Sequence, residues 1–148
     1  MIIRRATAED VPAIVAMLAD DELGARRETP DDLAPYLRAF AEVDAAGHEV
    51  LVVAERDGEV VGTLQLTVLR GLSRAGASRA QVEGVRVAAS ARRQGLGEEL
   101  MRWAIEEARA RGCVVVQFTS DKTRGDAHRF YRRLGFAQSH EGFKLALS

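Results

Sequence analysis

The sequence contains a single cysteine among its 148 residues, so Cys113 has no partner for a disulfide within the chain. One cysteine also cannot anchor a zinc cluster, and no spacing of His, Cys and Asp residues fits a metal site. We therefore expect no metal. The stretch GCVVVQF around Cys113 is typical of a core strand, which predicts that this cysteine is a small buried residue.

An excess of positive charge is also missing. The 21 Lys and Arg residues are balanced by 22 Asp and Glu residues, and no basic run is longer than two residues. Nucleic-acid-binding domains carry a broad positive surface, so a nucleic-acid partner is not expected.

Long apolar runs are absent as well. No run approaches twenty residues, and the start MIIRRATAED has no apolar core. A signal peptide and a membrane span are therefore not expected, and the predicted location is cytoplasmic. The chain shows no internal repeat and no low-complexity segment, and its length suits one domain over residues 1–148.

Along the chain, segments whose apolar residues have strand periodicity alternate with segments whose apolar residues have helix periodicity. This pattern predicts an α/β domain. Asp57-Gly58 joins two β-branched runs and predicts a tight hairpin turn with positive φ at both residues. Polar loops are expected at 20–30 and 70–78. The expected helices cover 9–20, capped by Thr7, then 30–43, a long helix from about 94 or 95, and a shorter helix that contains AHRFYRRLGF. The expected strands cover 2–6, the two hairpin runs, 80–87, 114–119 and a final strand FKLAL at 143–147.

The long helix carries one apolar stripe and ends at Gly112, a position that favours a left-handed cap. Its N-terminus follows the stretch ARRQGLG. Unpaired N–H groups at a helix start favour an anion, glycine allows close approach, and Arg92 and Arg93 add positive charge. These residues suit a pyrophosphate. The alternative is a simple turn with solvated arginines.

Two other phosphate motifs do not fit this stretch. A P-loop needs Gly-Lys-Ser/Thr at the helix start, but Gly97 is followed by Glu98 and Glu99. A dinucleotide fingerprint needs a small third residue where Leu100 stands.

The stretch VRVAASARRQGLGEEL resembles the coenzyme A signature of the GNAT superfamily of N-acetyltransferases, and AHRFYRRLGF resembles the second signature of that family. The tail AQSHEGFKLAL is similar to a subgroup near the aminoalkylphosphonate acetyltransferases. The resemblance implies a mixed, mainly antiparallel sheet whose fourth and fifth strands splay apart. It further implies acetyl-CoA as co-substrate, held by Val85, Arg86, Val87, Arg92, Arg93, Gln94, Gly95, Leu96, Gly97, Arg124 and Phe130.

The same resemblance suggests two catalytic residues. Glu83 matches a position where family members often carry a glutamate base that works through water; its alternatives are amine binding or a solvated strand residue. Near Val85, a backbone N–H would polarise the thioester carbonyl. Gly84 is expected to form a bulge that re-aims this strand, or else to fill a packing gap.

Tyr131 matches the general acid that protonates the leaving thiolate. It also lies on an apolar helical stripe, so a core aromatic is the alternative. Arg124 stands where the family commonly has asparagine, which leaves its role open.

The acceptor is expected to be a primary amine of a small molecule. Arg26 and Arg27 are candidates to pair with an acidic group on it, and His140 is a candidate to line its site. A peptide or protein amine is the rival acceptor, and a CoA-binding module without turnover is the rival from another class. The sequence does not identify the acceptor amine, and it leaves open whether the protein forms a homodimer.

Overall fold

The computed structural model describes residues 1–120 and 125–148, with side chains in the second range from residue 127 onward. The chain forms two units, Met1–Gln117 and Phe118–Ser148.

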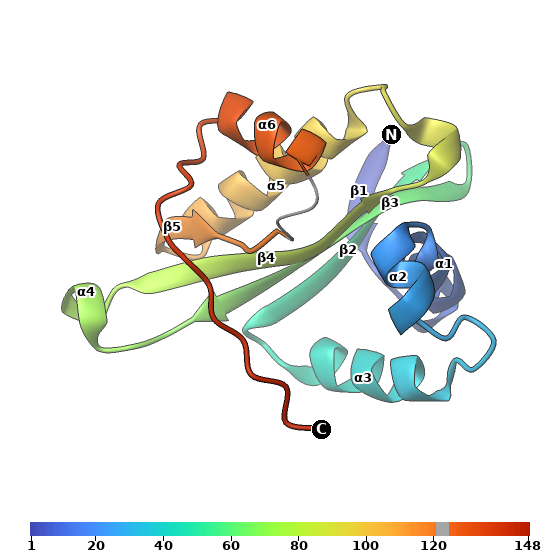
Figure 1. Ribbon diagram of the computed structural model, residues 1–148, viewed down its shortest axis with the longest axis horizontal. Helices are drawn as coiled ribbons and strands as arrows, with labels where there is room; N and C mark the ends of the chain where they lie inside the picture. Colours follow the sequence, from blue (N-terminus) through green and yellow to red (C-terminus); the bar gives the residue numbers. More distant parts are fainter. Residues whose placement is uncertain (121–124) are drawn as a thin grey trace. The chain divides into compact units, whose positions relative to one another are not determined.

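The first unit is built on a five-stranded sheet (Figure 1). Its strands lie in the order β1-β2-β3-β4-β5, with the first four antiparallel and β5 parallel to β4. The predicted mixed, mainly antiparallel sheet is confirmed. The strand bounds are β1 Ile2–Arg5, β2 Glu49–Arg56, β3 Glu59–Leu69, β4 Ser78–Val87 and β5 Cys113–Gln117.

Helices cover both faces of this sheet (Figure 1). On one face lie α1 (Val11–Ala19), α2 (Glu22–Arg27) and α3 (Ala34–Ala45), and on the other lies α5 (Leu96–Ala110). Short helices also occur at 8–10, 73–76 and 89–91. None of the helices in the described parts of the chain is long and apolar enough to cross a membrane.

The core consists of aliphatic side chains at strand and helix periodicity. The predicted stripe of α5 is confirmed, because Leu100, Met101 and Ala104 are fully buried. Burial of one large aliphatic side chain contributes about 1.5–3 kcal/mol. The stripe therefore holds α5, and with it the loop that precedes α5, against the sheet.

Local turn chemistry also agrees with the sequence. Asp57 and Gly58 have φ of 53° and 80°, which confirms the tight hairpin turn between β2 and β3. Gly112 has φ of 78° after the end of α5, as a left-handed cap requires. Both features depend on residues that are close in the chain.

A partly buried ion pair holds the start of α1. Two Arg4 guanidinium nitrogens donate to the Asp10 carboxylate at 2.8 and 3.0 Å, and Asp10 Oδ2 also accepts from the Thr7 backbone N–H at 2.7 Å. Asp10 is only 7% exposed. The hydrogen bond from Arg4 holds the pKa of Asp10 below its ordinary value.

Four local expectations need correction. The predicted loop at 20–30 contains α2, which Asp21 caps by accepting the Gly24 N–H at 2.5 Å. The next helix begins at Ala34 instead of Pro30. Cys113 is half-buried because β5 lies at the sheet edge. Residues 143–147 form no strand within the second unit.

Candidate active site

A bulge in β4 is the most distinctive feature of the sheet. Thr63 of β3 pairs with Arg86 and Gln65 pairs with Glu83, so Gly84 and Val85 together oppose one residue of β3. Gly84 has φ of 64°, a conformation that disfavours residues with a Cβ. The expected bulge at Gly84 is therefore confirmed.

Beyond its first four residues, β4 separates from β5. The two strands pair from Ser78 with Cys113 to Gln81 with Gln117, and β4 then continues alone on this side to Val87. The backbone of residues 82–87 thus has no pairing to β5 within the described chain. An extended ligand with amide groups fits such an edge, because it can take the hydrogen bonds of a missing strand.

The bulge and this separation occur in the same part of β4. Directly paired residues of neighbouring strands point to the same face of the sheet. Glu83 is paired with Gln65, so both side chains point to the face that α1 and α3 cover. Glu83 is exposed there. Its carboxylate is therefore accessible to a small molecule on that face.

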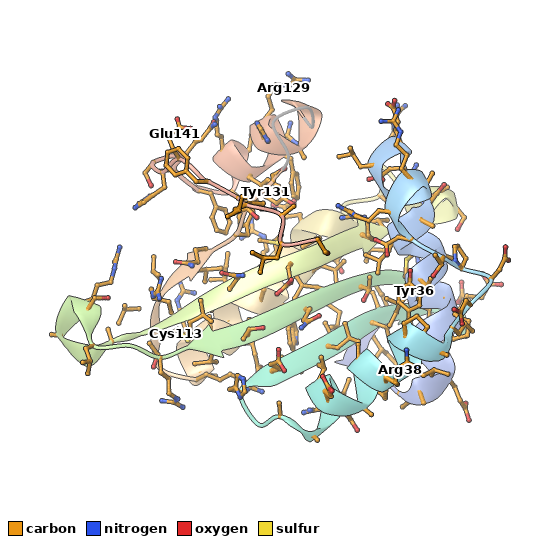
Figure 2. All side chains as sticks on the ribbon, turned by 60° about the horizontal axis from the view of Figure 1, so that its bottom comes forward. Tyr36, Arg38, Cys113, Arg129, Tyr131 and Glu141 are labelled. Carbon is orange, nitrogen blue, oxygen red and sulfur yellow. The ribbon has the colours of Figure 1, made fainter. Side chains whose placement is uncertain are left out.

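A cavity of about 150 Å³ lies on the same face, between α1, α3 and the sheet. Gly84 and Gln65 belong to its wall, so the cavity reaches the bulge. Most of the other wall residues are aliphatic, and Tyr36 of α3 is among the few polar ones (Figure 2). The Tyr36 hydroxyl donates to Glu28 Oε1 at 2.9 Å and accepts the Thr29 N–H at 2.8 Å.

The loop after β4 has the backbone that an anion site needs. Arg93 and Gly95 have φ of 64° and 77°, and α5 begins directly afterwards at Leu96. Leu96 is buried, which fixes the start of the helix. The first N–H groups of α5 thus lie beside two glycines, where they can bind a pyrophosphate.

Side chains around this loop connect it to other elements. Arg92 Nη2 donates to Asp20 Oδ2 at 3.0 Å, which ties the loop to the end of α1, and Arg56 donates to Gln94 Oε1. Arg93 is exposed. An open hollow of about 450 Å³ lies between the end of α1 and residues 88 and 89.

Arg86 lies just after the bulge, and its side chain is only 19% exposed. Its Nη1 donates to the Val85 carbonyl at 2.8 Å, and its Nη2 lies 3.9 Å from Asp21 Oδ2. The residue therefore joins the end of β4 to the N-terminus of α2.

The second unit contains α6 (Gly125–Arg133) and an aromatic cluster. The ring centroid of Tyr131 lies 4.2 Å from that of Phe118 and 5.3 Å from that of Phe130. Phe136 packs against Phe118 at 4.9 Å. Tyr131 is half-buried, and these rings fix its orientation on α6 (Figure 2).

Comparison with known proteins shows the family to which the chain belongs. The profile of the Acetyltransferase (GNAT) family matches residues 12–136, which include β4, the glycine loop and α6. The chain belongs to the GNAT family of acetyltransferases. The bulged β4 and the loop before α5 therefore lie in a GNAT fold, as the sequence motifs predicted.

Curated GNAT relatives cover most of the chain. The aminoalkylphosphonate N-acetyltransferase of Salmonella typhimurium is 33% identical and covers 98% of this chain and 90% of its own length. The L-methionine sulfoximine/L-methionine sulfone acetyltransferase of Pseudomonas aeruginosa is also 33% identical, over 90% of this chain and 78% of its own. The chain is an acyltransferase of this family.

A solved structure agrees with the fold. The crystal structure of a protein from Bacillus halodurans C-125, described as a transcriptional regulator, is 47% identical. It superimposes with a TM-score of 0.95 over 99% of both chains.

The remaining candidate residues lie in several places. Arg26 and Arg27 are exposed on the last turn of α2 and pair with Glu22 at 3.1 Å and Glu28 at 3.2 Å. His140 is exposed, with its Nδ1 2.7 Å from Ser139 Oγ. Arg124 lies outside the described residues.

Sequence reasoning missed Asp20, Asp21 and Tyr36. The two aspartates form ion pairs with arginines more than sixty residues away, and no local pattern marks such contacts. Tyr36 lies within the expected helix at 30–43, and helical periodicity gives no sign that its hydroxyl also bonds Glu28 and Thr29. Among the described residues, no three His, Cys, Asp or Glu side chains are grouped as metal ligands.

Proposed function

We propose that this GNAT protein transfers the acetyl group of acetyl-CoA directly to a primary amine of a small molecule. The observation that carries the proposal is the run of features along one strand: β4 leaves β5, bulges at Gly84 and continues into the glycine loop at the start of α5. Acetyl-CoA is long and thin, with its thioester at one end and its pyrophosphate farther along. The bulge would lie beside the thioester, and the glycine loop would lie beside the pyrophosphate.

The donor would lie along this run. The backbone of Val85 and Val87 would bond the pantetheine amides at the edge that β5 leaves open. Residues 92–97 would hold the pyrophosphate, with Arg93 exposed and the first N–H groups of α5 beside Gly95. Arg92 would first have to exchange its ion pair with Asp20 for the phosphate.

Glu83 would act as the base and Tyr131 as the acid. The amine nitrogen attacks the thioester carbonyl carbon, and its proton passes to Glu83 directly or through water. A C–N bond forms, the C–S bond breaks, and the leaving thiolate takes a proton from Tyr131. The exposed position of Glu83 on the face that bears the cavity supports the first assignment, and the family motif supports the second.

The partly enclosed cavity beside Gly84 favours a small acceptor over a protein surface. The curated relatives point the same way, because the acceptors in their names, an aminoalkylphosphonate and methionine sulfoximine, are small amines. We propose that Arg26 and Arg27 recognise an acidic group on the acceptor. Their exposed ion pairs with Glu22 and Glu28 would then have to open. His140 stays a candidate residue of the acceptor site.

A panel of amines incubated with acetyl-CoA and the purified chain tests the acceptor class. The panel contains aminoalkylphosphonates, amino acids, amino sugars and lysine peptides, and mass spectrometry detects the amide. We expect acetylated small amines. Acetylation of the peptides alone would select the rival acceptor class, and acetyl-CoA binding with no product from any amine would select a module without turnover.

The double variant Arg26→Ala/Arg27→Ala tests acceptor recognition. We expect a raised KM for an acidic acceptor with kcat nearly unchanged. The matched control is Arg102→Ala/Arg109→Ala, which removes two exposed, ion-paired arginines from α5. Equal KM values in both double variants would remove Arg26 and Arg27 from the acceptor site.

A further inference from the structure

The cavity between α1, α3 and the sheet has an almost wholly apolar wall. Apolar side chains from three elements form most of it: Ile14 and Leu18 of α1, Phe40 and Val43 of α3, and Leu51 of β2. None of the described residues in this wall is charged. Burial of a charge without a partner is very costly. A phosphonate or carboxylate would therefore stay outside the cavity, and so would the acidic group proposed to pair with Arg26 and Arg27.

The few polar side chains of the wall offer little to water. The Thr63 hydroxyl donates to the Val52 carbonyl at 2.9 Å. The Tyr36 hydroxyl already makes the two hydrogen bonds described above. Apolar cavities stay dry because a buried water needs several polar partners, and one of about 150 Å³ binds benzene. The cavity beside Gly84 has the same volume, about 150 Å³.

One end of the cavity lies at the reaction centre of the proposed mechanism. Gln65 and Gly84 belong to the wall, and Gln65 is the direct partner of Glu83 on the neighbouring strand. The Cβ atoms of such paired residues lie about 4.5–5.5 Å apart. An amine beside Glu83 thus has this end of the cavity next to it, and the carbon chain that carries the amine can enter.

The side of the cavity that α3 forms is incompletely packed. No residue of α3 is buried, and Phe40 and Val43 are only half-buried although both are apolar. Transfer of their remaining apolar surface out of water is favourable. A ligand with a hydrocarbon surface can supply the contacts that α1 and the sheet leave unmade.

We propose that this cavity binds the hydrocarbon group of the acceptor, so that the substrate is a primary amine with an uncharged apolar group of up to about six carbons, the size of benzene. The inference deepens the proposed acetyl transfer and rests on it for the identity of the reacting group. The amine would lie beside Glu83, and the hydrocarbon group would lie between α1 and α3. Each methylene buried in this way should raise kcat/KM about fourfold until the cavity is full.

Binding of benzene tests the cavity without any acetyl transfer. Methyl NMR spectra of the purified chain are recorded while benzene is added. We expect saturable shifts for methyl groups of the wall, such as those of Ile14 and Leu51, and none for Leu100, which is buried on α5. Wall methyl groups that do not shift, or that shift no more than Leu100, would overturn the proposal.

Amines of increasing length test the substrate class. With acetyl-CoA as donor, kcat/KM should rise about fourfold per methylene from ethylamine to hexylamine. Ala39 is an exposed residue of α3 that belongs to the wall, so Ala39→Phe adds a phenyl group there and should remove both the rise and the benzene shifts. The matched control Ala41→Phe adds the same group at an exposed position of α3 outside the wall and should keep both.

The results distinguish a failure of this inference from a failure of the proposed function. Acetylation that does not depend on chain length, or that depends on it equally in Ala39→Phe and Ala41→Phe, would overturn the apolar site and leave acetyl transfer standing. Benzene shifts in a chain that acetylates no amine would contradict acetyl transfer, and the substrate class with it.

Discussion

The bulge at Gly84 offers a test in which backbone strain and catalysis can be separated. An alanine Cβ at this position would meet Leu18 Cδ2 at 3.9 Å, an ordinary van der Waals contact. The substitution therefore adds no clash, and its cost comes from φ of 64° alone. A non-glycine residue in this region costs about 1–2 kcal/mol. For a chain of this size, that lowers Tm by about 3–6 °C.

Gly58→Ala is the matched control, because Gly58 has φ of 80° and no atom lies within 4 Å of the added Cβ. Its stability cost should be similar, but it lies in a hairpin turn away from β4. If the bulge aims the Val85 N–H at the thioester, relief of strain in Gly84→Ala moves that donor. We expect kcat to fall by roughly 10²-fold, the scale for one lost donor of this kind.

The assay is thiol release from acetyl-CoA with a saturating amine, beside thermal melts of both variants. Gly84→Asn should recover much of the loss, since asparagine tolerates positive φ better than alanine. A Gly84→Ala protein as destabilised as Gly58→Ala, yet with an unchanged kcat, would refute a positioning role for the bulge.

Three further predictions concern the acid, the donor site and the fold. Tyr131→Phe keeps the ring contacts with Phe118 and should stay folded, but kcat should fall by roughly 10²- to 10⁴-fold; full activity would give the acid role to another group. Gly97→Glu adds bulk and negative charge in the first turn of α5 and should abolish the thermal shift that CoA gives; an unchanged shift would contradict the pyrophosphate site. The pKa of Asp10 is lowered in the folded state, so its ion pair with Arg4 stabilises the fold fully above about pH 4 and loses this effect as the pH falls further. The Tm difference between the parent and Asp10→Asn should therefore shrink towards pH 2.5. A Tm difference that does not change with pH would contradict a stabilising role of the ion pair.

Features that depend on neighbouring residues could be predicted from the sequence. Asp57-Gly58 fixes its turn by local φ preferences, and the stripe of α5 follows from helical periodicity. Gly84 could be predicted as a bulge because a lone glycine in a strand marks a change in the ladder. The loop at 92–97 could be singled out because its glycines and the start of α5 are contiguous in the chain; its role in binding the donor stays a prediction.

Features that depend on distant partners could not be predicted. The short helix α2 was predicted as a loop because its sequence is polar. Its Gly24 packs against the end of α1, where the Cβ of any other residue would lie only 1.9 Å from the Leu18 carbonyl oxygen. The pairing of Arg86 with Asp21 joins elements 65 residues apart in the chain. Alternation at 143–147 predicted a strand that the described chain does not form, because a period of two marks an extended segment without specifying a partner strand.

Transfer of a labelled acetyl group tests the central claim most directly. The purified chain is incubated with acetyl-CoA labelled with carbon-13 in the acetyl group and with the best amine of the panel. We expect one labelled amide for each CoA thiol released, at a rate that falls strongly in Gly97→Glu. Release of CoA without labelled amide, or no release above the protein-free rate with any amine, would contradict N-acetyl transfer by this chain.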